Sequence, residues 1–244
     1  MATTPTETPQ VTDRDAVAPW WHTVFFLVFL LVLAAADALQ LGRGTPEHVN
    51  RMGLYAASIV MELAMVGYVW LFGLRPRGKR MRDLIGGRWE RVGDFFRDAG
   101  VALVFWGVVL MALVTTSIIL RENPTAMKAM KLMLPQTGAE MIGWVLLSVT
   151  AGFSEEFLFR GYLQRQFLAL TGKQGVAVAL QAVVFGAAHA YQGWKGVVTI
   201  TVYGALFGAL AVMRKSLRPG MMQHAAQDTL TGIVVSLLSK HGYM

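Results

Sequence analysis

Apolar residues run along this chain in long stretches, broken by short polar segments, and they show neither the alternation of a β-strand nor the narrow stripe of a soluble helix. About 20 apolar residues suffice to span the hydrocarbon core of a bilayer as a helix. We therefore expect an all-α, polytopic membrane protein of about seven transmembrane helices. These helices are predicted at residues 20–39, 54–74, 99–120, 139–170, 175–189, 196–213 and 219–238.

The polar segments divide the chain into three parts. Residues 1–18 are rich in Thr, Pro and acidic side chains and show no apolar period, which predicts a disordered tail. Residues 19–138 hold the first three membrane helices, and residues 139–244 hold the remaining four. Between the second and third helices lies a strongly basic connector, 75–98. Its 84–98 part has the spacing of an amphipathic surface helix, although the same basic residues can simply set the membrane topology.

Composition supports a membrane protein, since 55% of the residues are hydrophobic and only 15% are charged, against about 25% charged in soluble domains. The absence of cysteine excludes disulfides and thiolate metal sites. The net charge of +7 does not point to nucleic acid, because the basic residues cluster in the segments between apolar stretches. With the amino terminus inside, fifteen of the 22 Lys and Arg residues fall on the inner side. We expect a cytoplasmic amino terminus and a cell inner membrane location.

The most unusual segment is 151–165, where Glu155, Glu156 and Arg160 interrupt an apolar helix. One ionisable residue in lipid costs about 2.5–3.5 kcal/mol on insertion scales, so three in six positions require a reason. Glu156 and Arg160 are four residues apart, with the acid first, and should form an ion pair on one helix face. Taken alone, this pair has a purely structural interpretation. Glu155 is rotated by about 100° from its neighbour and has no such partner.

Two further polar pairs at helical spacing follow: Phe185 with His189, and His224 with Asp228. A carboxylate such as Glu155 and a neutral imidazole can together deprotonate a water molecule, which gives general-base hydrolysis. His224 and Asp228 could then stabilise the developing oxyanion. Alternatively, Glu155, His189 and His224 could bind zinc and leave one position open for water. The residue pattern leaves both possibilities open.

Depth along the helices places this predicted site near the inner surface. Glu156 and His189 each lie about sixteen residues, roughly 24 Å, from the turn at 172–173. His224 lies only about 9 Å past Arg218. The three residues meet only if the hairpin of the fourth and fifth helices projects into the cytosol. We therefore expect a buried polar catalytic cavity that is open to the cytosol.

Glu-Glu-x-x-x-Arg at 155–160, Phe-x-x-x-His at 185–189 and His-x-x-x-Asp at 224–228 closely resemble the three motifs of the CAAX-protease and bacteriocin-processing family of intramembrane endopeptidases. The resemblance implies an all-helical membrane protease whose first Glu and first His activate the attacking water. It further implies that the second His and the following Asn or Asp bind the oxyanion. Members have been discussed both as zinc enzymes and as metal-free glutamate proteases. Asp at position 228, in place of Asn, is a poorer oxyanion donor unless it is protonated.

This resemblance marks Glu155, Glu156, His189, His224 and Asp228 as catalytic residues, with Arg160 in a structural ion pair. Family members cut prenylated carboxyl-terminal peptides or process peptides and membrane proteins in bacteria. The Ala-, Gly- and Arg-rich composition looks bacterial, which makes a prenylated substrate the less favoured choice. The expected partner is thus a membrane-embedded or lipid-anchored peptide or protein within the lipid bilayer, and the oligomeric state is left open.

The competing hypothesis is a membrane protein without enzymatic activity. A proton-coupled carrier or an immunity factor could use the same buried polar cluster, because intramembrane Glu and His also serve as proton relays. Glu62, in the second predicted helix, is a further candidate functional residue. Its alternative interpretation is a hydrogen-bonded or lumen-facing carboxyl group with no part in the chemistry.

Overall fold

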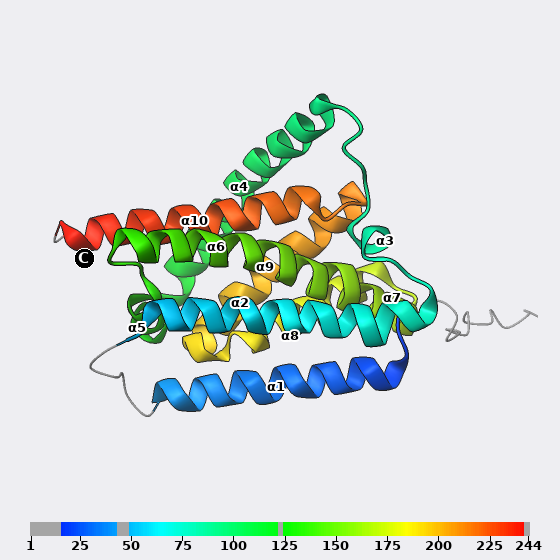
Figure 1. Cartoon of the computed structure of the whole chain (residues 1–244), viewed down its shortest axis with the longest axis horizontal. Coiled ribbons are helices and arrows are strands. Elements are labelled where there is room, and N and C mark those ends of the chain that lie inside the picture. Colours follow the sequence, from blue (N-terminus) through cyan, green and yellow to red (C-terminus); the bar gives the residue numbers. More distant parts are fainter. Residues whose placement is uncertain (1–15, 43–48, 122–123, 242–244) are drawn as a thin grey trace, which may run out of the picture.

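The computed structural model describes residues 16–42, 49–121 and 124–241, which are helical apart from short connections. Most long helices lie side by side, while α4 leans away from the bundle at its amino end (Figure 1). The elements, in chain order, are α1 (Trp20–Gly42), α2 (Arg51–Tyr68), η1 (Val69–Leu74), η2 (Arg75–Arg77), α3 (Met81–Ile85), α4 (Val92–Leu120), α5 (Pro124–Met133), α6 (Gly138–Glu155), η3 (Glu156–Leu163), α7 (Gln164–Thr171), α8 (Gln174–Ala188), η4 (Ala190–Gln192), α9 (Gly193–Arg214) and α10 (Arg218–Lys240).

Within the described part of the chain, five helical stretches are long and apolar enough to cross a membrane. These are 20–40, 51–77, 92–120, 138–171 and 190–214. All seven predicted stretches are helical, but the count of seven spans is not confirmed. The helix α8 has only 15 residues, because it ends where a 3-10 turn begins, and α10 is not among the five. Polar residues along α10, among them Arg218, His224 and Asp228, lower its hydropathy.

The basic connector does not form the separate amphipathic helix suggested for 84–98. The short helix α3 is followed by a non-helical link, and 92–98 are already the first turns of α4. The reason is a helix start at Arg91, whose backbone N–H donates to the Asp94 carboxylate at 3.1 Å. The link itself is tied to the start of α10, because the Leu217 N–H donates to the Ile85 carbonyl at 2.8 Å.

The amino end of α1 is attached to the 138–171 helix well before that helix ends. The Gln166 side chain accepts from the Val17 N–H at 2.7 Å and donates to the Ala18 carbonyl at 3.0 Å. Arg165 donates to the Leu84 carbonyl at 2.9 Å. Residues 165–166 therefore lie level with the beginning of α1 and with α3, and the tip of the α7–α8 hairpin continues beyond that level.

The predicted disordered tail, 1–18, lies outside the described residues except for its last three positions. Residues 16–18 are buried, and they are held by the contacts to Gln166. The packed part of the chain thus begins a few residues earlier than the composition suggests.

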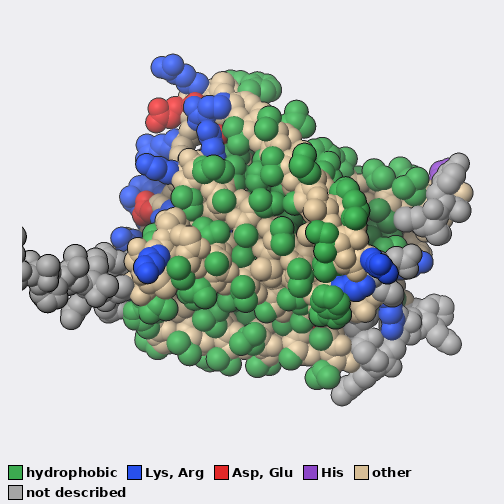
Figure 2. Space-filling view, turned by 180° about the vertical axis from the view of Figure 1, so that it is seen from behind, with side chains coloured by type: hydrophobic (Ala, Val, Ile, Leu, Met, Phe, Trp, Pro, Cys, Tyr) green, Lys and Arg blue, Asp and Glu red, His purple; other side chains and the backbone are tan. Residues whose placement is uncertain are grey.

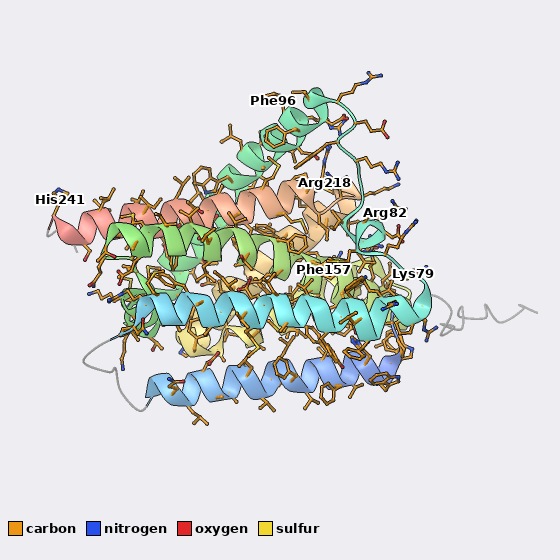
Figure 3. The ribbon with its side chains drawn as sticks, viewed as in Figure 1. Lys79, Arg82, Phe96, Phe157, Arg218 and His241 are labelled. Atoms are coloured by element: carbon orange, nitrogen blue, oxygen red, sulfur yellow. The ribbon has the colours of Figure 1, made fainter. Side chains whose placement is uncertain are left out.

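The outer surface has the distribution of a membrane protein. Apolar side chains cover the middle of the face in Figure 2, and Lys and Arg gather toward its two ends. Leu103, Val104, Met111 and Ile118 on α4 are each at least 67% exposed, which suits contact with lipid. Lys79 and Arg82 lie at one end of the molecule and His241 at the other (Figure 3).

Candidate active site

The two adjacent glutamates of the site stand on the 138–171 helix, which is the most buried of the five apolar stretches. The 138–171 helix changes from α6 to the π-helix η3 at Glu156 and returns to an α-helix at Gln164. All eight residues of η3 are buried. A π-helical turn holds an extra residue and often occurs at functional positions. No breaker marks this segment, so the sequence pattern predicts an ordinary α-helix here.

Glu156 and Arg160 form the ion pair that their spacing predicts. Arg160 Nη1 lies 3.2 Å from Glu156 Oε1, and the two side chains are 0% and 1% exposed. None of the three guanidinium nitrogens makes a well-aligned hydrogen bond to another described residue. The guanidinium carbon instead lies 4.2 Å from the Phe185 ring centroid and 5.2 Å from that of Phe207. Charge attraction and the ring faces therefore hold Arg160 in place.

His224 is the centre of the polar cluster. Its Nδ1 lies 3.2 Å from Glu156 Oε1, and its Nε2 lies 3.6 Å from Glu155 Oε2 and 3.6 Å from Asp228 Oδ2. The ring is 4% exposed and packs against Tyr203. One imidazole from α10 thus joins both carboxylates of the 138–171 helix to the carboxyl group on its own helix.

His189 lies just past the end of α8, at the edge of this cluster. Its Nδ1 donates to the Phe185 carbonyl at 2.9 Å, which leaves Nε2 as the nitrogen able to accept a proton. Its ring centroid lies 4.8 Å from that of Phe185, which in turn lies 6.5 Å from that of His224. In the described part of the chain, no hydrogen bond or ion pair joins His189 to Glu155. The structure therefore brings together four of the five predicted catalytic residues by direct contact and places the fifth beside them.

The two adjacent glutamates differ in exposure. The Glu155 side chain is 21% exposed and that of Asp228 36%, whereas Glu156 is 1% exposed and paired with Arg160. A substrate or water can reach Glu155 and Asp228 but not Glu156. Of the two adjacent glutamates, Glu155 is therefore the one that solvent reaches.

Close packing between α6 and α10 sets these distances. A Cβ atom at Gly152 would lie 2.7 Å from the backbone nitrogen of Ala225, so only glycine permits this approach. The Trp144 indole N–H donates to the Asp228 carbonyl at 2.9 Å and fixes the level of α10 along α6. Neither contact follows from spacing within a single helix. The small residues at 152 and 225 were the available signal.

The predicted zinc ligands do not fit a metal centre as they are placed. Over the described ranges, no group of three or more His, Asp or Glu side chains is arranged to hold a metal ion. His224 directs one ring nitrogen at Glu156 and the other between two carboxyl groups. Zinc binding by Glu155, His189 and His224 therefore stays a prediction.

Comparison with known proteins finds one family, which matches the segment that carries the three motifs. Residues 137–230 match the family of type II CAAX prenyl endopeptidases described as Rce1-like, and this range includes Glu155, His189, His224 and Asp228. No curated protein and no solved structure matches the chain. The resemblance carried by the three motifs is confirmed, and the apolar helices make the chain a multi-pass membrane protein. Residues 137–230 are thus similar to the Rce1-like type II CAAX prenyl endopeptidases, and this similarity covers less than half of the chain.

Proposed function

We propose that this protein is an intramembrane endopeptidase that hydrolyses a peptide bond of a membrane-associated protein or peptide, with water activated by Glu155. One observation carries the proposal. His224 gathers Glu155 and Asp228 within 3.6 Å, inside the segment that matches a protease family. Such an arrangement supplies a base and a polar group for the developing charge at the same point.

Glu155 acts as the general base in this mechanism. Its carboxylate takes a proton from water while the water oxygen attacks the scissile carbonyl carbon, and the protonated carboxyl group then donates that proton to the leaving amine nitrogen. His189 orients the same water through Nε2, because its Nδ1 is bound to the Phe185 carbonyl. Both roles require access from outside the protein, which the partial exposure of Glu155 provides.

His224 stabilises the oxyanion in this mechanism. Its Nδ1–H points to Glu156, and in the protonated imidazole Nε2–H donates to the carbonyl oxygen as negative charge develops there. Asp228 orients Nε2 or, in its protonated form, donates a second hydrogen bond to the same oxygen. The buried Glu156–Arg160 pair keeps the imidazole in position.

With the amino terminus of the protein on the inner side of the membrane, the site would open toward the cytosol. His224 lies six residues, about 9 Å, past Arg218 at the start of α10. Lys79 and Arg82 of the basic connector lie at the same end of the bundle (Figure 3), which favours the inner side of a cell inner membrane. The substrate is then a membrane-embedded or lipid-anchored protein presented at the inner leaflet, and an unprenylated one is favoured in a bacterium.

Membrane fractions from cells with the wild type and with Glu155→Ala provide the test. We expect intact substrates to accumulate in the variant, and purified Glu155→Ala and His189→Ala to lose peptide cleavage while they remain folded. Cleavage retained by either variant would contradict the mechanism. Proton flux into proteoliposomes without any hydrolysis would favour a carrier instead.

A further inference from the structure

Glu62 on α2 is an ionisable residue of a membrane helix that the mechanism above does not use. Its side chain is half-buried. One carboxyl oxygen, Oε2, is fully buried and has no hydrogen-bond partner among the described residues. A buried carboxyl group without a partner is costly, and in a membrane helix such a group points to a function.

The helix face that carries Glu62 is turned toward α6. Tyr55 and Glu62 are seven residues apart, two turns of an α-helix, and so lie on the same face of α2. Tyr55 packs on α6, with its ring centroid 5.9 Å from that of Trp144. A Cβ atom at Gly143 would lie 3.0 Å from the Tyr55 ring. Glu62 therefore faces the same helix that carries Glu155.

Glu62 and Asp228 also lie at similar depth. The helices α2 and α6 run side by side in the same direction (Figure 1), so residues seven positions past Tyr55 and Gly143 lie at about the same level. This level falls near residue 150 of α6. On the antiparallel α10, Ala225 lies opposite Gly152, which places Asp228 about one turn back, near the same level.

Glu155 lies slightly more than one turn further along α6, and helical side chains tilt back toward the amino end. Its carboxyl group is thereby directed toward the level of Glu62 and Asp228. Glu62, on the face of α2 that packs against α6, therefore lies on the side of α2 nearest these carboxyl groups. Three helices, α2, α6 and α10, thus each contribute one carboxyl group around a single imidazole.

This set has more hydrogen-bond acceptors than donors. Glu156 is occupied by Arg160 and by His224 Nδ1, and the other nitrogen of His224 is shared between Glu155 and Asp228. Glu62 receives no donor from this set. A bound molecule can supply such a donor, and a peptide substrate carries N–H donors in its backbone amides and in basic side chains.

We propose that Glu62 is a substrate-binding residue whose carboxyl group accepts a hydrogen bond from an N–H donor of the peptide, about one helical turn from Glu155. The inference rests on the proposed endopeptidase function and names a contact of that same site. The peptide would lie between α2 and α10, with the scissile carbonyl at Glu155 and His224. Since the contact serves binding rather than proton transfer, its loss should raise KM and leave kcat nearly unchanged.

The test compares Glu62→Leu and Glu62→Gln with wild type and with the control Met61→Leu, which alters the exposed neighbour on α2. The probe is a pool of internally quenched decapeptides, with and without a farnesylated cysteine and with lysine or norleucine near the cleavage site. For Glu62→Leu we expect KM to rise at least about tenfold and kcat to change by less than about threefold. An unchanged KM would overturn the proposal, as would a loss confined to thermal stability.

The isosteric Glu62→Gln separates the two possible donors. If the donor is a backbone amide, the amide oxygen of Gln still accepts it, and KM stays within about threefold of wild type for every peptide. If the donor is a basic side chain, KM rises about tenfold for lysine peptides alone. Both results support the contact. A change in kcat alone would instead assign Glu62 to the proton-transfer chemistry and refute a binding role.

Peptide binding tests the same contact without hydrolysis. Fluorescein-labelled members of the pool are titrated into Glu155→Gln and into Glu155→Gln/Glu62→Leu, and Kd is read by anisotropy. We expect Kd to be about tenfold weaker in the double variant. Equal Kd values, or no binding to either variant, would overturn the role of Glu62. A wild type that binds the pool but cleaves no peptide would instead refute the proposed function.

Discussion

Replacing Glu156 by Gln separates the structural pair from the chemistry. The substitution keeps the volume and one acceptor oxygen but removes the charge that lies 3.2 Å from Arg160 Nη1. Breaking a buried ion pair costs about 3–5 kcal/mol, because the remaining charge stays buried without compensation. Arg160 is 0% exposed at its side chain and has no other described ion-pair partner. Because Gln retains one acceptor oxygen, we expect the lower end of this range, a loss of about 3 kcal/mol in the free energy of unfolding.

Chemical and thermal unfolding of the detergent-solubilised protein measures this loss, with two controls. Glu90→Gln makes the same chemical change at an exposed position and should shift stability by less than about 0.5 kcal/mol. Adding Arg160→Met to Glu156→Gln removes the stranded charge and should recover most of the loss. Peptide cleavage should fall less in Glu156→Gln than in Glu155→Gln. Wild-type stability in Glu156→Gln would refute the pairing and the reasoning built on it.

Three further predictions concern packing, metal dependence and pH. Gly152→Leu should destabilise the fold by about 1–3 kcal/mol and abolish cleavage, because the new side chain would push Ala225 away. The control Gly100→Ala, which has nothing within 4 Å of the added Cβ, should be neutral in unfolding and activity assays. Dialysis against a strong zinc chelator should leave the cleavage rate within about twofold of the untreated enzyme, and a loss that added zinc restores would establish the metal mechanism instead. The Arg80 backbone N–H donates to the Asp83 carboxylate and holds its pKa below the ordinary value. This contact stabilises the start of α3 fully at pH values above the ordinary pKa of Asp, and the stabilisation is lost as the pH falls through the lowered pKa. The protection factors of the α3 amides in hydrogen exchange should therefore fall in acid in the wild type but not in Asp83→Asn.

The pattern of apolar residues determined most of the secondary structure. It placed all seven long helical stretches, since a run of apolar residues can satisfy its backbone in lipid only as a helix. It also predicted the Glu156–Arg160 pair, because residues four apart on a helix are neighbours wherever that helix packs. The three motifs were sufficient to indicate the protease family, which the match over residues 137–230 confirmed.

Only the tertiary structure decided which of these helices meet. Spacing within one helix says nothing about its neighbours, so it could not show that His224, rather than His189, contacts both Glu155 and Glu156. Nor could it show that Glu62, far from every motif in the chain, lies on the face of α2 that packs against α6. The relative positions of these residues depend on the close approach that Gly152 permits and on the side-by-side packing of α2 and α6. Both are set by contacts between distant segments, which no local pattern records.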